Sequence, residues 1–362
     1  MTAREKQILE LIRNNPLVSQ KELAEQLNIA RSSVAVHITN LIKKGKIKGK
    51  GYVLDEEDYV VVIGGANMDI TGFSDNLLVP NDSNPGRIRM SSGGVGRNIA
   101  ANLAKLGIQT KLISAVGDDL FGRRIIEDSS LAGIDTAYIK TVSAHPSSIY
   151  LSIINATGEM DVAVSDMKIT DSLDTEWLKK HHQLISGAAA VVMETNLPQS
   201  SIRYLANTHG AKLFLDTVST TKTKKVKDII GSFHTIKPNR IEAEYLTDFK
   251  IQNQTDVEKA VRFFLDKGTT NVFISLGKEG VAYGTADKTG FFKMKTERMV
   301  NTTGAGDAFM AVLVYGYLND IDIHEAVKLA STASYLTLTS EDTSNPEISL
   351  QQILKTKEKL NL

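Results

Sequence analysis

Apolar residues in this chain gather in short continuous runs that alternate with stretches of helical spacing. Residues 59–63 form an unbroken apolar run, mostly β-branched, which is typical of a strand buried on both faces of a sheet. Further strand-like segments, shorter or interrupted by polar residues, occur at 111–116, 188–193, 213–216, 235–237 and 272–275. Repeated strand and helix units of this kind predict a doubly wound, mainly parallel α/β sheet with helices on both faces.

The first 55 residues instead show the spacing of short amphipathic helices. Thr2 with Glu5, and Ser19 with Glu22, have the arrangement of capping boxes, which begin helices. A third helix is predicted from about residue 31 to 44, because apolar residues recur there at intervals of three and four. The N-terminal segment therefore reads as three short helices.

A hairpin with alternating lysines, over 46–54, follows the third helix, and the whole segment resembles a winged helix-turn-helix. The third helix of such a domain enters the major groove of DNA, while lysines of the wing meet phosphates. The candidate DNA-binding residues are Arg31, Ser32, Ser33, His37, Lys46, Lys48 and Lys50. A small helical dimerisation domain with a solvated charged face is the alternative. Residues 1–55 thus form one predicted domain and residues 56–362 the second.

The charged residues are distributed unevenly between these two predicted domains. The chain has 42 basic and 42 acidic residues, but residues 1–54 hold ten of the basic and four of the acidic ones. The rest of the chain holds 32 basic and 38 acidic residues. A small basic module attached to a larger acidic one indicates a nucleic-acid contact at the N-terminus.

Composition narrows the class further. At 362 residues, two or more domains are expected, and a hydrophobic content of 42% with 23% charged residues is ordinary for a globular protein. No apolar run has the length of a membrane span, and the N-terminus lacks the apolar core of a secretory signal. The absence of cysteine excludes disulfides and thiolate metal sites. We therefore expect a cytoplasmic protein without a membrane partner.

A glycine-containing segment near the C-terminus carries the clearest chemical signal. Residues 301–307 read Asn-Thr-Thr-Gly-Ala-Gly-Asp, and a helix-like stretch follows. Gly304, Ala305 and Gly306 would cradle a phosphate beside the positive end of that helix. Asp307, in the first helical turn, faces the same space and can take a proton from an attacking hydroxyl. Taken alone, such a glycine pair is more often a plain turn.

A second glycine motif, Gly-Gly-Val-Gly-Arg-Asn at 93–98, also precedes a helix-like stretch. In this order and spacing, the two motifs resemble the signatures of the PfkB, or ribokinase-like, carbohydrate kinase family, over about residues 58–350. Asp69 follows the first strand, where α/β sheets bind ligands. The resemblance implies that Asp69 and Asn98 hold the hydroxyls of a sugar. It also implies three further substrate-binding residues: Asn67, Gly93 and Gly94.

The same resemblance implies ATP and Mg²⁺ as cofactors. Asn239 and Glu242 match the family's Asn-x-x-Glu motif, and a carboxylate suits a Mg²⁺ that keeps several waters, so Glu242 is expected to act through water. The other implied nucleotide-binding residues are Ser275, Gly277, Gly280, Thr303 and Asn345. Asn301 stands where many family members have an aspartate that helps to bind an activating monovalent cation. We therefore expect no strong activation by K⁺.

Residues 147–165, with parts of 70–92, resemble the small β-sheet lid of this family. Such lids close over the sugar, exclude water that could intercept the phosphoryl group, and often form a dimer interface. The resemblance therefore implies a ribokinase-like fold with a β lid, preceded by the winged helix-turn-helix, and a homodimer.

Loop segments at 81–88 and 165–169 go further and resemble bacterial pseudouridine kinases. The implied reaction is transfer of a phosphoryl group from ATP to the 5′-hydroxyl of pseudouridine. Ser148 and Asp166 are candidates to recognise the uracil base. For Asp166, the role of a surface turn residue is an equally good interpretation. The alternatives are a PfkB kinase for another sugar or nucleoside, such as ribose, and a ligand-sensing transcription regulator whose kinase fold only binds.

Overall fold

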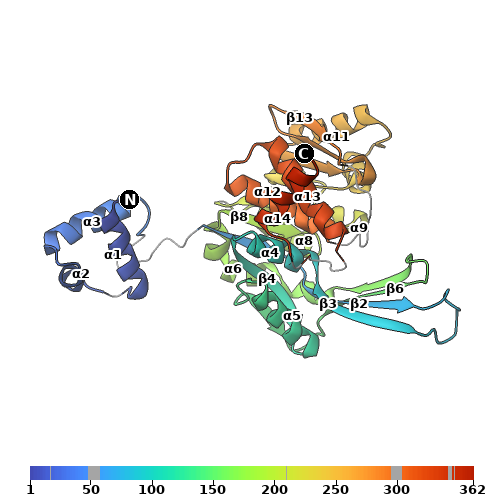
Figure 1. Cartoon of the computed structure of the whole chain (residues 1–362), viewed down its shortest axis with the longest axis horizontal. Helices are drawn as coiled ribbons and strands as arrows, with labels where there is room; N and C mark the ends of the chain where they lie inside the picture. Colours follow the sequence, from blue (N-terminus) through green and yellow to red (C-terminus); the bar gives the residue numbers. More distant parts are fainter. Residues whose placement is uncertain (17, 48–57, 209, 295–303, 341–344, 346) are drawn as a thin grey trace. The chain divides into compact units, whose positions relative to one another are not determined.

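The computed structural model describes residues 1–16, 18–47, 58–208, 210–294, 304–340, 345 and 347–362 (Figure 1). The chain divides into two compact units, Met1–Asp58 and Tyr59–Leu362. The first unit holds the helices α1 (Ala3–Asn14), α2 (Gln20–Leu27) and α3 (Arg31–Lys43). Both expected capping boxes are present at the starts of α1 and α2.

Apolar residues of all three helices form the small core of the N-terminal unit, which includes the fully buried Ile8, Leu23, Val34 and Leu41. Lys44, just beyond α3, bonds Glu5 of α1 at 2.8 Å, so the capping box of α1 is tied to the end of α3. Most of the expected wing hairpin, from residue 48 onward, lies outside the described residues.

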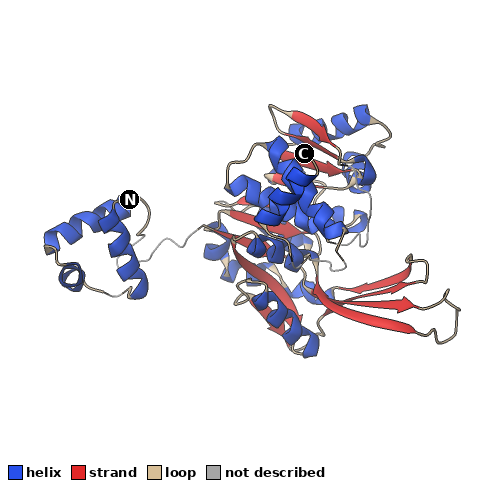
Figure 2. Cartoon of the chain, viewed as in Figure 1, coloured by secondary structure: helices blue, strands red, loops and turns tan. Residues whose placement is uncertain are grey.

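A nine-stranded sheet in the order β13-β12-β11-β10-β9-β8-β1-β4-β5 forms the centre of the second unit (Figure 2). Neighbouring strands are parallel except at β12 and β13, which pair antiparallel at one edge. The bounds are β1 Tyr59–Ile63, β4 Gln109–Gly117, β5 Ile139–Val142, β8 Ala190–Glu194, β9 Lys212–Asp216, β10 Thr235–Lys237, β11 Asn271–Ser275, β12 Val281–Gly284 and β13 Thr289–Phe292. The expected mainly parallel sheet is confirmed.

Helices cover both faces of this sheet, because alternate residues of each central strand enter different cores. On β1, Val61 and Ile63 belong to one core cluster, and Val60 and Val62 belong to the other. The α-helices are α4 Val95–Lys105, α5 Leu120–Leu131, α6 Thr175–Lys180, α7 His182–Ser186, α8 Gln199–Ala206, α9 Thr220–Thr223, α10 Arg240–Thr247, α11 Gln254–Asp266, α12 Ala305–Leu318, α13 Ile323–Leu338 and α14 Leu350–Lys359. Short 3₁₀ helices lie at Lys168–Ser172, Ile230–Ser232 and Gly277–Glu279.

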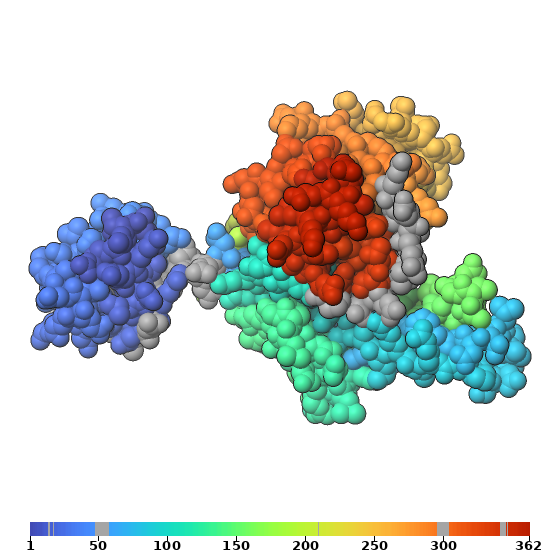
Figure 3. Space-filling model, viewed as in Figure 1, coloured from blue at the N-terminus to red at the C-terminus, as the bar shows by residue number. Residues whose placement is uncertain are grey.

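A second sheet of four strands, which we call the lid, projects from this body (Figure 3). Its order is β3-β2-β6-β7, with bounds β2 Asn67–Ser74, β3 Gly86–Gly93, β6 Ser148–Ile154 and β7 Met160–Asp166. The two segments expected to form a small β-sheet therefore do so. Asn67 is the first residue of β2 and Asp69 the third, because the chain passes from β1 into the lid within a few residues.

Candidate active site

The two glycine motifs meet at the carboxyl ends of the parallel strands. Gly304 precedes α12 with a φ of +84°, a left-handed conformation that glycine adopts readily. This turn aims the first amides of a 14-residue helix at the space beside Asp307. Asn98, in the first turn of α4, donates from Nδ2 to Asp307 Oδ2 at 3.0 Å, and both residues are buried. Side chains 209 positions apart in sequence thus form one site.

Asp69 lies at the base of the lid, beside the glycine motif at 93–98. Its Oδ1 accepts a hydrogen bond from Asn67 Nδ2 at 2.6 Å, and burial raises the pKa of Asp69 to about 6 despite that bond and the charge of Arg97. A Cβ placed on Gly93 would lie 2.0 Å from Asp69 Oδ2, so only glycine leaves room for this carboxylate. The carboxylate is thereby held in one place, with Oδ1 bound to Asn67 and Oδ2 against Gly93.

Strand register decides which lid residues share the face of Asp69. Asn67 pairs with Ser148, whose Oγ is buried and has no hydrogen-bond partner among the described residues. Asp69 pairs with Tyr150, which pairs with Ser165. Ser148 therefore joins the candidate site, and Tyr150 and Ser165 are neighbours that the sequence analysis missed.

Asp166 is not brought to this face. It is exposed, pairs with Ile149, and follows Ser165, so the strand alternation places it on the opposite side of the lid. Its carboxylate accepts a hydrogen bond from the backbone of Lys168 at 3.2 Å, the contact of a turn residue. The only sequence signal for Tyr150 and Ser165 was their alternation with apolar residues along β6 and β7.

Three charged residues at the ends of adjacent strands were given no role in the sequence analysis. Glu194, Asp216 and Lys237 end β8, β9 and β10 and stand side by side in register. Lys237 Nζ lies 3.0 Å from Asp216 Oδ2, and both side chains are buried. A Cβ on Gly306 would lie 3.2 Å from Lys237 Nζ, so the ammonium group sits directly beneath the first turn of α12.

Glu194 completes the buried charges around the site. It accepts hydrogen bonds from the backbone of Gly65 at 2.6 Å and of Asn196 at 2.5 Å, which fix the turn after β1. Burial raises its pKa, although these bonds oppose the change. The sequence offered one signal for Glu194, Asp216 and Lys237: each is a charged residue at the end of a predicted strand.

The electrostatics of Asp307 suit a proton acceptor. Burial, with the negative charges of Asp216 and Glu194, raises the pKa of Asp307 well above its usual value, while the Asn98 hydrogen bond and the Lys237 charge act to lower it. Burial also disfavours the charge of Lys237, but its ion pair and hydrogen bond with Asp216 raise the Lys237 pKa overall. Lys237 therefore stays charged, and a carboxylate with a raised pKa is a stronger base.

Asn239 and Glu242 form the capping box that begins α10. Asn239 Oδ1 accepts from the Glu242 amide and Glu242 Oε2 accepts from the Asn239 amide, each at 2.9 Å. The same Glu242 oxygen accepts a 2.5 Å hydrogen bond from Thr217 Oγ1, and burial raises the Glu242 pKa. Ser275 pairs with Asn239 across an isolated parallel bridge, which places the loop after β11 beside this helix.

The remaining predicted nucleotide residues are placed as follows. Gly277 has a φ of +60° and Gly280 a φ of +120°; a Cβ on Gly280 would lie 2.3 Å from the carbonyl oxygen of Phe292. The Asn345 amide donates to the Leu336 carbonyl at 2.9 Å, a contact that holds the chain end against α13. Asn301 and Thr303 lie outside the described residues.

The predicted DNA-binding residues that the structure describes lie in α3 or shortly after its end. Arg31, Ser32, Ser33 and Lys46 are exposed, and His37 is half-buried, with an Nδ1 that has no hydrogen-bond partner in the described part of the chain. Lys48 and Lys50 lie outside it.

Among the described residues, no group of three or more His, Cys, Asp or Glu side chains is arranged to hold a metal ion. In the same residues, no helix combines the length and the apolar character needed to span a membrane.

The close approach of Gly93 to Asp69 gives a first prediction. Gly93→Ala should lower kcat/KM for the acceptor substrate by about 100-fold, since the methyl group must displace the Asp69 carboxylate, and leave the KM for ATP nearly unchanged. Gly72→Ala, in the same pair of strands, is the matched control, because its methyl group would meet only the flexible end of Ile153. Equal losses in both variants, measured by steady-state kinetics, would show that Gly93 serves the lid fold alone.

Comparisons with known proteins agree with this geometry. Residues 57–350 match the model of the pfkB family of carbohydrate kinases, and residues 1–48 match a winged helix-turn-helix DNA-binding model. The uncharacterized sugar kinase YeiI of Escherichia coli K12 is 35% identical over 356 residues, which cover 98% of each chain. The pseudouridine kinase of the same organism is 37% identical over 301 residues, or 83% of this chain and 96% of its own. A candidate sugar kinase from Clostridium perfringens, of solved structure, has a TM-score of 0.76 at 36% identity and covers 84% of this chain and 96% of its own.

Proposed function

This chain belongs to the pfkB family of carbohydrate kinases, which makes it a phosphotransferase with an alcohol acceptor, and we propose that its substrate is the nucleoside pseudouridine. Its fold is ribokinase-like, and a winged helix-turn-helix domain precedes the kinase domain. The observation that carries the proposed chemistry is the contact of Asn98 with Asp307 at the N-terminus of α12. The 37% identity to a pseudouridine kinase over nearly all of that enzyme's length supports the choice of nucleoside.

Asp307 acts as the general base in the proposed reaction. It takes the proton of the 5′-hydroxyl while the bond between O5′ and the γ-phosphorus forms. The bond from that phosphorus to the bridging oxygen breaks, and ADP leaves with the electron pair. Asp69 and Asn98 orient the ribose through its hydroxyls, so the attacking oxygen stays in line with the phosphorus.

The first turn of α12 stabilises the charge on the transferring phosphoryl group. In the described residues, no side chain caps this helix, and the amides after Gly304 point toward the space beside Asp307. Lys237 lies beneath Gly306 and adds a fixed positive charge in a buried setting, where it acts more strongly than it would in water. We assign Lys237 the role of a positioning residue that acts through this turn.

The residues present fit ATP and Mg²⁺. The start of α12, which no side chain of the described residues caps, offers its first amides to an anion, and Lys237 Nζ, 3.2 Å from the position of a Cβ on Gly306, adds the positive charge that a phosphate chain requires. Glu242 offers one carboxylate near Asp216 and Lys237, which suits a Mg²⁺ held mainly by phosphates and waters, and that ion would neutralise phosphate charge. Ser275, Gly277, Gly280, Thr303 and Asn345 remain proposed nucleotide contacts. We also propose that the reaction rate depends only weakly on K⁺, because Asn301 stands where many family members have a charged aspartate. A comparison of rates in K⁺ and in a K⁺-free buffer would test this.

In this proposal the lid recognises the base of the nucleoside through Ser148 and its neighbours on the Asp69 face.

The opposite face of the lid carries a row of apolar residues in register, Met90, Ile70, Leu151 and Val164, of which Met90, Leu151 and Val164 are exposed. Because an exposed apolar row marks an interaction surface, we propose a homodimer that covers it. A monomer in sedimentation analysis at assay concentration would contradict the dimer. A cytoplasmic location also belongs to the proposal.

The assay that tests the substrate is ADP release from ATP and Mg²⁺ with a panel of pseudouridine, uridine, adenosine, ribose and fructose 6-phosphate. We expect turnover selective for pseudouridine. Turnover of another member would keep the mechanism and replace the substrate. No turnover on any member would favour a ligand-sensing regulator whose kinase fold only binds.

The N-terminal unit supports a second proposed activity, DNA binding through α3 and the wing. Changing both Arg31 and Lys46 to alanine should weaken binding of a labelled mixed-sequence duplex and reduce the salt slope by about 2, since each basic side chain that meets a phosphate contributes about 1. Lys355→Ala with Lys359→Ala in α14, at two exposed positions of the kinase unit, is the charge-matched control. Fluorescence anisotropy over a salt series measures both quantities, and an unchanged slope in the double variant would remove α3 from the interface.

A further inference from the structure

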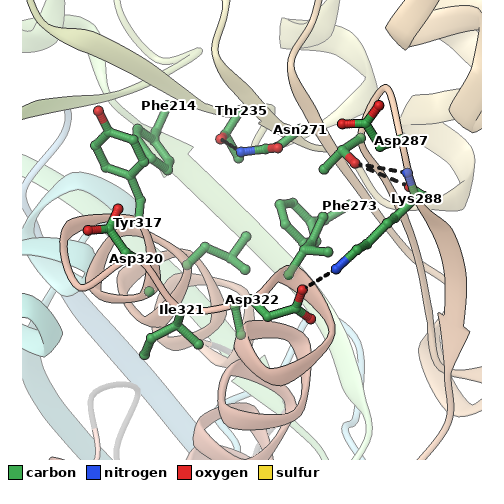
Figure 4. A pocket seen from close by; sticks show the side chains of 15 residues that line it. Phe214, Thr235, Asn271, Phe273, Asp287, Lys288, Tyr317, Asp320, Ile321 and Asp322 are labelled. Atoms are coloured by element: carbon green, nitrogen blue, oxygen red, sulfur yellow. Dashed lines mark hydrogen bonds and ion pairs between the residues drawn. The ribbon is translucent and has the colours of Figure 1, made fainter.

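A pocket of about 370 Å³ lies at the opposite end of the sheet from Asp307 (Figure 4). It forms where β10 and β11 begin and where α12 ends, whereas the catalytic groups stand at the ends of β8, β9 and β10 and at the start of α12. Its volume falls within the usual range for small-molecule sites, about 300–1,000 Å³. None of the roles proposed above uses this pocket.

The walls suit a flat ring that carries hydrogen-bonding groups. Phe214, Phe273 and Tyr317 line the pocket, with Phe214 and Tyr317 together on one side and Phe273 across from them (Figure 4). Asn271 and Thr235 lie side by side along another wall, joined by a long 3.4 Å hydrogen bond from the amide nitrogen to the hydroxyl. A side-chain amide offers a donor and an acceptor together, which complements the edge of a nucleobase.

The charges at the rim select against anions. Asp287, Asp320 and Asp322 line the pocket together with Lys288 as the only cation among its lining residues. Lys288 is bonded to Asp322 at 2.5 Å, so two carboxylates are left without an opposite charge in the pocket. A phosphorylated ligand would meet like charge, whereas an uncharged heterocycle would not.

The walls of the pocket belong to the same elements as the catalytic charges. Phe214 and Asp216 lie two residues apart on β9, and Thr235 and Lys237 lie two residues apart on β10, which corresponds to about 7 Å of strand. Tyr317 and Asp307 lie on α12, separated by about 15 Å of helix. A ligand that moves these walls therefore moves the Asp216–Lys237 pair and the first turn of α12.

We propose that this pocket is an effector site for an uncharged, planar heterocycle of nucleobase size, and that its occupancy changes the rate of phosphoryl transfer through α12, β9 and β10. The proposal does not depend on which acceptor the kinase uses, because it predicts binding at a separate place in the chain.

The test uses the full chain with free adenine and free uracil as probes, since neither has a hydroxyl for the kinase to phosphorylate. Equilibrium dialysis should show saturable binding of at least one probe that persists when ATP and the acceptor are added at saturation. Asn271→Leu, which keeps the size of the side chain and removes its amide, should weaken that binding about tenfold or more. Bound probe should change kcat or KM by about fivefold.

A variant with altered charge provides a second, independent test of the pocket. Asp287→Asn with Asp320→Asn removes two exposed carboxylates, and asparagine tolerates the φ of +52° found at Asp320. This double variant should keep nucleobase binding and gain affinity for uridine 5′-monophosphate at the pocket. Three results would each overturn the proposal: no saturable binding of either probe, full displacement by substrates, or nucleobase binding that Asn271→Leu leaves unchanged.

Discussion

Asp307→Asn is expected to lower kcat by about 1,000-fold with little change in either KM, because the variant keeps the shape of the side chain and loses the proton acceptor. The fold should survive, since an asparagine oxygen at this position can still accept the 3.0 Å hydrogen bond from Asn98. Steady-state ADP release, with the thermal midpoint as a folding check, measures the effect. Asp118→Asn, at an exposed position, is the matched control and should retain full activity.

The pH dependence of the parent enzyme belongs to the same prediction. Asp307 accepts a proton only when ionised, and its pKa is raised, so kcat should fall as pH falls through that raised value. Asp69, with a pKa raised to about 6, should add a loss of acceptor binding below that pH, because its protonated form can accept fewer hydrogen bonds. Activity that is flat on the acid side, or an Asp307→Asn variant within tenfold of the parent, would contradict the role of Asp307 as base.

The second large effect is expected at Lys237. Lys237→Met leaves the buried Asp216 carboxylate without its partner, so the free energy of unfolding should fall by about 3–5 kcal/mol. The same change removes a positive charge beneath Gly306 and should lower kcat by about 100-fold. It also removes a charge that lowers the Asp307 pKa, so the acid limb of the kcat profile should move to higher pH.

A double variant separates stability from catalysis. Lys237→Met with Asp216→Asn removes the stranded charge and should recover much of the lost stability in denaturant unfolding. It should also return the acid limb toward lower pH, because Asp216 is one of the charges that raise the Asp307 pKa. The rate should nevertheless stay low, since no cation remains beneath α12. Parental kcat in the double variant would mean that Lys237 only stabilises the fold.

The sequence predicted the body of the fold well because its central strands are buried on both faces. Continuous apolar runs such as 59–63 have few alternatives to a central parallel strand, and the capping boxes at Thr2 and Ser19 specify helix starts by their own hydrogen bonds. The lid was harder to place, because β7 is exposed along its whole length and carries apolar residues on its surface. The sequence placed Asp69 only as a residue that follows the first strand, whereas in the structure Asn67 and Asp69 lie at the beginning of β2.

The site was predictable only where residues form a spaced motif. Asp307 and Asn98 stand in glycine motifs whose turns require glycine, and so the motifs could be recognised before the contact between them was known. Glu194, Asp216 and Lys237 come from three strands, one residue each, and no spacing along the chain links them. Asp166 lies one position away from the face of Asp69, because successive side chains of a strand point to opposite faces and Ser165 shares the face of Asp69; this placement agrees with the alternative of a surface turn residue.

The central claim is transfer to the 5′-hydroxyl of pseudouridine, and a competition in one tube tests it most directly. Pseudouridine and uridine at equal concentration are incubated with ATP and Mg²⁺, and the phosphorylated products are separated and their phosphorylated oxygen identified by NMR. The account predicts that pseudouridine 5′-phosphate dominates and that neither product forms with Asp307→Asn. Equal amounts of the two nucleotides, or phosphate on another oxygen, would contradict it.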